Sequence, residues 1–250
     1  MSQLMRVAVL GARGRMGTTV SQAISLASDL ELVAALDVED NLTDMLVGQP
    51  QIVVDFTVPD AVMDNLAFVV ENGMHAVVGT TGFDEAKLAK VSAMLEGTSS
   101  NVVIAPNFGL AAVLMMQFAA KAAPYFDSAE IVELHHPRKV DAPSGTARRT
   151  AELIGQARRN ARSEPMPDAT QDELVGARGA VIDGVHVHSV RLAGLVAHQE
   201  VILGGPGESL TIRHDSYDRE SFMPGVLLAL RTVSTRPGLT YGLEHILGLQ

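Results

Sequence analysis

A short segment of mixed charge is the part of this sequence best suited to carry chemistry. It holds two adjacent histidines, His135 and His136, and a lysine four residues after the first, Lys139. Histidine titrates near neutral pH, and neighbouring positive charge can bring lysine there, so both can deliver a proton to a reacting atom. The chain has 19 lysines and arginines against 29 acidic residues, so such a cluster of potential cations needs a reason. We interpret the segment as a site for a small, negatively charged substrate.

A helix start follows this segment directly. Ser144 is a residue type that favours the N-cap position, and Gly145 and Thr146 open a helical pattern. The first amides of a helix have no partner inside it and lie at the positive end of its dipole. The sequence therefore predicts an anion site at this helix start, suited to a carboxylate of the substrate.

Alternation along an extended chain bears on the role of each residue in the segment. Adjacent residues point to opposite sides, so His135 and His136 are expected to differ in role. Lys139 would face the same cavity as His135 if the chain stayed extended through Pro137. Arg138 is expected to lie in solvent.

Two plainer interpretations of the cluster stay open at this point. The histidines and charges can simply be solvated surface residues, as isolated polar residues usually are. Metal binding is the other alternative, but two adjacent histidines do not easily ligate one ion, and no H-x-x-x-H or H-E-x-x-H pattern supports it, so no metal is expected. His186 and His188 share one face of a predicted strand and are interpreted as ordinary strand residues.

The elements that must position this segment follow two patterns along the chain. In the first part, apolar strands alternate with helical patterns, which indicates an α/β fold with a Rossmann-like, doubly wound parallel sheet. The strands are expected at residues 5–10, 32–36, 52–56, 75–79 and 102–104, and the helices at 15–27, 59–70 and 84–95.

After residue 106 the pattern changes. A long apolar helix at about 110–123 leads to a strand at 129–135, a helix at 145–159, and strands at 185–192, 198–203 and 209–214. Such β-rich material packs best as a mixed or antiparallel sheet, so we expect a second domain of the α+β class. A surface loop is expected at 163–172 and a further helix at 221–232.

A glycine-rich turn between the first strand and the first helix indicates a dinucleotide. Its spacing is G-x-x-G-x-x-G, from Gly11 to Gly17, and glycines let backbone N–H groups approach a pyrophosphate. Asp37 ends the second strand about 20 positions later, as expected for a ribose-binding carboxylate. The alternative is a turn between strand and helix that binds no ligand.

The charges near this turn bear on the choice between two nicotinamide cofactors. Asp37 should favour NADH, because its charge would repel a 2′-phosphate, whereas Arg13 or Arg15 could meet that phosphate. We therefore hypothesise dual use of NADH and NADPH. The loops at 79–82 and 105–108 follow the fourth and fifth strands, and they are expected to contact the cofactor because ligands bind at the carboxyl ends of such strands.

The composition limits the classes of protein to which the chain can belong. Of 250 residues 47% are hydrophobic, but no apolar run reaches the about 18 residues of a membrane-spanning helix. The absence of cysteine excludes disulfides, thiolate catalysis and cysteine zinc sites. A formal net charge of -10 argues against nucleic acid, which requires a basic face. We expect a soluble, cytoplasmic protein with neither a nucleic-acid nor a membrane partner.

Several motifs together resemble the 4-hydroxy-tetrahydrodipicolinate reductase family, formerly called dihydrodipicolinate reductase. The fifteen residues from Glu133 to Ala147 are the most specific block. Four shorter blocks match in order: Gly11 to Gly17, Asp55 to Thr57, Val78 to Gly82, and Ala105 to Phe108. The likeness spans nearly the whole chain and looks like the actinobacterial branch of the family.

The resemblance implies a reaction and an architecture. The reaction is the NAD(P)H-dependent reduction of 4-hydroxy-2,3,4,5-tetrahydrodipicolinate, a cyclic imine dicarboxylate, to 2,3,4,5-tetrahydrodipicolinate with loss of water, in diaminopimelate and lysine biosynthesis. Residues 1–106 and 217–250 would form the dinucleotide-binding domain, and residues 107–216 the substrate-binding and tetramerisation domain. Family members usually form homotetramers through the β-rich domain.

The resemblance also implies a role for each matching residue. His135 and Lys139 would donate protons, and the substrate would be bound by His136, Ser144, Gly145 and Thr146. The cofactor would be bound by Gly11, Ala12, Arg13, Gly14, Arg15, Met16, Asp37, Gly79, Thr80, Thr81, Ala105, Pro106, Asn107 and Phe108. Many relatives carry an acidic and a basic residue after the second strand, where this chain has Asp37 and Val38, and this departure puts a strong NADPH preference in doubt.

Two other functions stay open from the sequence. One is an amino-acid or semialdehyde dehydrogenase with the same nucleotide fold, although no cysteine exists for the acylating type. The other is a redox-sensing protein that binds NAD(P) without turnover. That last alternative predicts that His135 and Lys139 can be replaced without loss of function.

Overall fold

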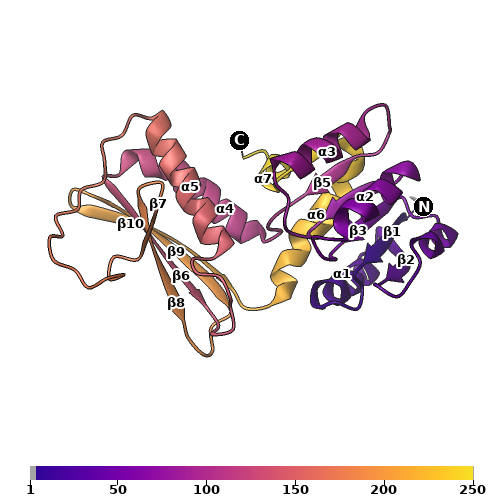
Figure 1. Cartoon of the computed structure of the whole chain (residues 1–250), viewed down its shortest axis with the longest axis horizontal. Helices are drawn as coiled ribbons and strands as arrows, with labels where there is room; N and C mark the ends of the chain where they lie inside the picture. Colours follow the sequence, from indigo (N-terminus) through magenta and orange to yellow (C-terminus); the bar gives the residue numbers. More distant parts are fainter. Residues whose placement is uncertain (1–3, 250) are drawn as a thin grey trace. The chain divides into compact units, whose positions relative to one another are not determined.

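The computed structural model describes residues 4–249 and divides them into two compact units. The first unit contains the described residues up to Leu110 together with those from Arg219 onward, and the second is Ala111–Asp218. The chain therefore leaves the first unit once and returns to it near its end (Figure 1).

The first unit is built on a six-stranded sheet in the order β11-β5-β4-β3-β1-β2, with every neighbouring pair parallel. Its central strands are continuous apolar runs that are buried on both faces, as parallel sheets covered by helices require. The strands are β1 Met5–Leu10, β2 Leu30–Leu36, β3 Ile52–Asp55, β4 His75–Val78, β5 Val102–Ile104 and β11 Leu239–Tyr241.

Helices flank this sheet in two groups: α1 packs beside α6, and α2 packs beside α3. The helices are α1 Arg15–Leu26, α2 Val62–Glu71, α3 Glu85–Leu95, α6 Met223–Thr232 and α7 Glu244–Leu247, with short 3₁₀ helices η1 Leu42–Gly48, η3 Arg219–Phe222 and η4 Val233–Thr235. The strand order reverses at β1, which lies between β2 and β3. Ligands of doubly wound sheets bind at such a reversal, at the carboxyl ends of the strands.

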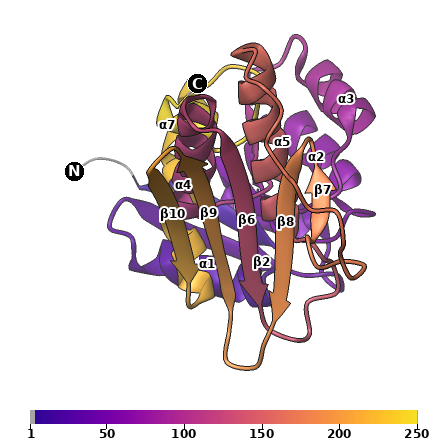
Figure 2. The same ribbon diagram turned by 90° about the vertical axis from the view of Figure 1, so that its left-hand side faces the viewer.

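The second unit holds a five-stranded sheet in the order β10-β9-β6-β8-β7. The pair β6 and β8 is parallel and the other pairs are antiparallel, so the sheet is mixed. The strands are β6 Ser128–His135, β7 Ala180–Ile182, β8 Val185–Arg191, β9 Ala197–Gly205 and β10 Glu208–Ser216. Figure 2 shows one face of this sheet toward the viewer, with helices α4 Leu110–Ala122 and α5 Gly145–Asn160 behind it; the short 3₁₀ helix η2 is Ala123–Tyr125.

The predicted fold class, a Rossmann-like parallel sheet and a second unit with a mixed sheet, is confirmed. The strands β7 and β11 were not predicted: each is a three-residue strand at a sheet edge with no buried residue, whereas the equally short β5 is buried throughout and was predicted. Helix α2 begins at Val62 and not at Pro59, which lies in the preceding turn. The loop expected at 163–172 has no helix or strand. Among the described residues, no helix is long and apolar enough to cross a membrane.

Candidate active site and cofactor-binding region

His135, the last residue of β6, lies over a buried carboxylate. Its Nδ1 atom is 2.5 Å from Oε2 of Glu133, which precedes it by two residues and therefore lies on the same face of the strand. The side chain of Glu133 is fully buried, and that of His135 is 14% exposed. Because Nδ1 is engaged with Glu133, Nε2 is the ring nitrogen suited to exchange a proton with a ligand.

Arg191, the last residue of β8, neutralises Glu133. Its Nη1 and Nη2 atoms each donate to a different oxygen of Glu133 at 2.8 Å, and the backbone N–H of Ser144 donates to the same carboxylate at 3.1 Å. Burial acts to raise the pKa of Glu133, but hydrogen bonds from Arg191, Ser189 and His135 outweigh it and lower that pKa. Glu133 is therefore an ionised carboxylate that ties β6, β8 and the start of α5 together.

The surroundings of His135 lower its pKa. Burial is the largest cause, Glu133 acts in the opposite direction, and the positive charges of Lys139 and Arg191 add to the lowering. A lowered pKa makes the imidazolium a stronger acid, and it also leaves a smaller fraction of His135 protonated near neutral pH. A chain of contacts joins Lys139 to the partner of His135: Lys139 pairs with Asp141, whose carbonyl accepts from Arg191, and Arg191 pairs with Glu133.

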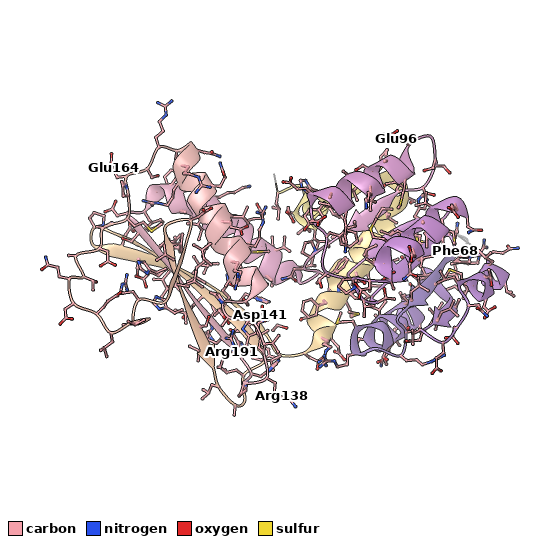
Figure 3. The ribbon with its side chains drawn as sticks, viewed as in Figure 1. Phe68, Glu96, Arg138, Asp141, Glu164 and Arg191 are labelled. Carbon is pink, nitrogen blue, oxygen red and sulfur yellow. The ribbon has the colours of Figure 1, made fainter. Side chains whose placement is uncertain are left out.

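Lys139 reaches this site by a route that the sequence did not predict. The chain turns at Pro137 and Arg138, and the backbone N–H of Lys139 donates to the carbonyl of His136 at 3.2 Å. The condition under which alternation would place Lys139 on the side of His135, an extended chain through Pro137, is therefore not met, because this turn hydrogen bond replaces strand geometry. Arg138 is exposed and points away from the sheet, as expected (Figure 3).

Asp141 joins Lys139 to the helix start. Its Oδ1 atom is 2.7 Å from Nζ of Lys139, and its carboxylate also accepts from the backbone N–H of Gly145. The hydrogen bond from Lys139 is the largest cause that lowers the pKa of Asp141. Its carbonyl accepts from Nη2 of Arg191 at 2.7 Å, and Figure 3 shows these two residues close together. The positive charges of the cluster are thus largely balanced by acids within the same unit.

The start of α5 has the predicted cap. The Oγ atom of Ser144 accepts from the backbone N–H of Ala147 at 3.2 Å, which confirms Ser144 as the N-cap. Gly145 is exposed and Thr146 is partly exposed at the first turn. Near this turn in sequence, Nδ1 of His136 is buried with no hydrogen-bond partner among the described residues. Buried polar atoms are normally paired, so this nitrogen is suited to contact a ligand or an ordered water.

Sequence reasoning missed three residues of this site: Glu133, Asp141 and Arg191. The two acids flank the histidines, so their proximity was a readable signal. Arg191 carried no such signal, because only the parallel pairing of β8 with β6 places it opposite His135.

The turn between β1 and α1 has the shape of a cradle for a phosphate. Gly11 has a φ of 74°, which residues with side chains rarely adopt. A Cβ atom on Gly17 would lie 2.0 Å from the carbonyl oxygen of Gly11, so only glycine allows this close packing. Helix α1 begins with Gly14 as its N-cap and has no acidic residue in its first turn. Its backbone amides and its dipole are therefore suited to an anion.

A cavity of about 550 Å³ lies where the strand order reverses. It is lined from the ends of β1, β2 and β3 by residues that include Gly11, Gly14, Asp37, Val38, Asp40, Phe56 and Thr57. The carboxylate of Asp37 accepts from the backbone N–H of Arg13 at 2.7 Å and from that of Val38 at 2.9 Å. A cavity of this size, with a glycine turn and a carboxylate at the end of β2, fits a dinucleotide.

The two further loops expected to contact the cofactor are held by the core of the first unit. Thr80 is buried, and its Oγ1 donates to the buried carboxylate of Asp55 at 2.7 Å, which also accepts from Thr57 and Asn65. The predicted residues in these loops are Gly79, Thr80 and Thr81, and Ala105, Pro106, Asn107 and Phe108; none of the seven lines the cavity among the described residues. Phe108 is buried, with its ring 5.9 Å from that of Phe56.

The sequence of this chain matches two models of one known protein family. Residues 5–108 match a family model described as dihydrodipicolinate reductase, N-terminus, and residues 111–247 match one described as dihydrodipicolinate reductase, C-terminus. The chain belongs to the dihydrodipicolinate reductase family. Among the described residues, no group of histidines and acids could hold a metal ion.

Relatives of this family are similar over their full length. The 4-hydroxy-tetrahydrodipicolinate reductase of Thermobifida fusca is 62% identical over 248 residues, covering 98% of this chain and 100% of its own. That of Mycobacterium marinum is 58% identical with the same coverage. A solved dihydrodipicolinate reductase from Paenisporosarcina, with dipicolinate bound, is 39% identical with a TM-score of 0.87, covering 98% of this chain and 100% of its own.

Family membership confirms the function expected from the sequence. The chain is an oxidoreductase that reduces 4-hydroxy-tetrahydrodipicolinate to tetrahydrodipicolinate, a reaction of diaminopimelate and lysine biosynthesis. The N-terminal family model covers residues 5–108 of the first unit, and the C-terminal model covers the second unit and residues 219–247 of the first. GenD2 from gentamicin A biosynthesis, solved with NAD, shares the fold at 14% identity and a TM-score of 0.64, with 100% of this chain and 92% of its own covered.

Proposed function

We propose that the second unit binds the cyclic imine dicarboxylate and delivers a proton to it, and that the first unit binds NADH or NADPH. A bound nicotinamide would supply the hydride. The observation that carries this division of labour is the contact of His135 with the buried, ionised Glu133, close to Lys139 and to the start of α5.

The substrate would be recognised by its carboxylates. Lys139 supplies an ammonium group, which is paired with Asp141, and the first turn of α5 supplies the amides of Gly145 and Thr146. On binding, the Gly145 amide would exchange the Asp141 carboxylate for a carboxylate of the substrate. His136 supplies a buried nitrogen that needs a partner. The Paenisporosarcina relative was solved with dipicolinate, a dicarboxylate of the same size class. This supports a small dicarboxylate as the ligand of the site.

His135 would give up its proton through Nε2. Hydride addition to one carbon leaves an electron-rich atom that must be protonated, and His135 is held by Glu133 in one orientation for that transfer. Burial and the charge of Lys139 strengthen it as an acid. Lys139 is the second proton donor: its ammonium group can also protonate the electron-rich atom of the substrate.

The cofactor would lie along the glycine turn, with its ribose at Asp37. We propose dual use of NADH and NADPH: the Asp37 carboxylate supports the first, and the exposed Arg13 and Arg15 support the second. The further residues of the two loops, Gly79 to Thr81 and Ala105 to Phe108, would contribute backbone contacts. Measurement of KM for both cofactors tests this proposal, and a preference beyond about a hundredfold, some 2.7 kcal/mol, would contradict it.

The direct test of the function is an assay of NADH oxidation on freshly prepared 4-hydroxy-tetrahydrodipicolinate. We expect turnover that depends on this substrate and that is inhibited by dipicolinate. Oxidation at the same rate without the substrate would overturn the assignment.

We also propose that the enzyme is a cytoplasmic homotetramer assembled through the β-rich unit. Part of the sheet surface is apolar and exposed, including Val181 and Ile202. Light scattering on the purified protein tests the number of subunits, and a monomer at assay concentration would contradict the proposal.

A further inference from the structure

Arg13, the residue expected to meet a 2′-phosphate, is already held by an acid. Its Nη2 atom lies 2.6 Å from Oδ2 of Asp40, in the turn that follows β2. Its Nη1 atom lies 3.9 Å from a carboxylate oxygen of Glu39. The side chain of Asp40 is 27% exposed, whereas that of Glu39 is 85% exposed. The contact with Asp40 is therefore the closer and the better shielded of the two.

The turn holds Asp40 in place. The same Oδ2 atom accepts from the backbone N–H of Asp37 at 2.8 Å, and the backbone N–H of Asp40 donates to the carbonyl of Asp37 at 2.9 Å. The hydrogen bond from Asp37 is the largest cause that lowers the pKa of Asp40, and the bond from Arg13 adds to it. Asp40 is thus an ionised group whose position is set by the backbone beside the ribose-binding carboxylate.

Asp40 also lines the cavity with Asp37 and the glycine turn. A 2′-phosphate placed beside Asp37 would need the Arg13 guanidinium, which forms its strongest hydrogen bonds with such groups. Arg13 would have to leave Asp40, and the released carboxylate would then lie near a phosphate of the same sign. NADH carries no 2′-phosphate. Its binding therefore neither draws Arg13 away from Asp40 nor places a second negative charge beside the Asp40 carboxylate.

We propose that Asp40 is a cofactor-specificity residue that lowers the affinity for NADPH relative to NADH by holding Arg13. This inference rests on the proposed binding of the nicotinamide cofactor in the first unit, and it assigns the balance between the two cofactors to one carboxylate. Dual use then reflects competition for Arg13 between Asp40 and the 2′-phosphate.

The test is Asp40→Asn, because asparagine keeps an oxygen for the N–H of Asp37 and loses only the charge. We expect the ratio of kcat/KM for NADPH to kcat/KM for NADH to rise about fivefold, the scale of a partly exposed ion pair. The rise should come from a lower KM for NADPH. Adding Arg13→Gln to this variant should abolish the rise, because the loss of the Asp40 charge then releases no guanidinium to the phosphate.

Glu39→Gln is the matched control. It removes the same charge from the same turn, but its pair with Arg13 is longer and exposed, so the ratio should change by less than about twofold. A ratio that stays the same in Asp40→Asn, or that rises equally in Glu39→Gln, would overturn the role of Asp40. Asp40→Ser, which also removes the charge, should raise the ratio as well, and an unchanged or lower ratio in that variant would count against the proposal. Absence of turnover with either cofactor in the unmodified enzyme would instead overturn the proposed function.

Discussion

Two ion pairs, one in each unit, show how differently the same kind of contact is used. In the second unit, Glu133 is fully buried and its partner Arg191 is only 20% exposed, with both guanidinium nitrogens at 2.8 Å. In the first unit, Arg13 and Asp40 are closer, at 2.6 Å, but the Arg13 side chain is 59% exposed. The distance between the charged atoms does not decide which pair is more costly to break. Burial of the side chains decides it.

The physical reason is the cost of leaving a charge alone. A buried charge that loses its partner has no water to replace it, whereas an exposed charge is simply hydrated. The buried pair can therefore hold His135 and the start of α5 in one arrangement. The exposed pair can exchange partners, which suits a choice between two cofactors.

The largest effect should come from Glu133→Ala. Arg191 and His135 would be left without their acid, and we expect the free energy of unfolding to fall by about 3 kcal/mol. Asp29→Ala is the comparison in the first unit, because Asp29 forms an exposed two-bond pair with Arg231 at 2.8 and 2.9 Å. Asp29→Ala should lower the free energy of unfolding by less than about 1 kcal/mol. Urea denaturation followed by circular dichroism measures both, and equal losses would refute the comparison.

The next effect concerns catalysis. His135→Ala and Lys139→Ala should each lower kcat by about a hundredfold, the usual scale for a lost proton donor. Arg138→Ala is the control, because Arg138 lies in the same turn but is exposed. Wild-type rates in both His135→Ala and Lys139→Ala would show that the buried pair positions no proton donor.

A third change tests whether the glycine turn between β1 and α1 binds the phosphates of the cofactor. The added methyl group of Gly17→Ala would collide with the carbonyl of Gly11 and displace the turn. We expect KM for NADH to rise about tenfold, the scale of a modest overpacking cost. Calorimetric titration with NADH would show whether binding is what changed, and an unchanged dissociation constant would argue against a phosphate cradle here.

The smallest effect is a dependence of stability on pH. Burial lowers the pKa of His135 and His214 in the second unit and of His75 in the first. Below about 6.5 the unfolded chain binds protons that the folded chain does not, so stability should fall as the pH falls from there through the lowered values. Hydrogen exchange at pH 7 and pH 5.5, corrected for the intrinsic rate, should show a larger loss of protection in the second unit. Stability that increases on acidification would contradict the sign.

The sequence predicted best where the local pattern was long or the chemistry distinctive. The apolar runs of β1 and β3, the glycine turn and the Ser144 cap were all readable because each depends on neighbours in the chain. Prediction failed for the short edge strands β7 and β11, which have no buried residue, although the equally short but buried β5 was predicted. At Pro137 the chain turns, so the alternation that would place Lys139 beside His135 along an extended chain does not apply.

The sequence by itself determined the chemical groups available: two histidines and a lysine before a capped helix, and glycines between a strand and a helix. It also determined the family, through blocks of residues that match in order. Only the tertiary structure decided which charges face each other. The pairing of β6 with β8 brings Arg191 to Glu133, and the turn after β2 brings Asp40 to Arg13. These partners lie far apart in sequence, and their contacts depend on sheet register and burial, which no local pattern specifies.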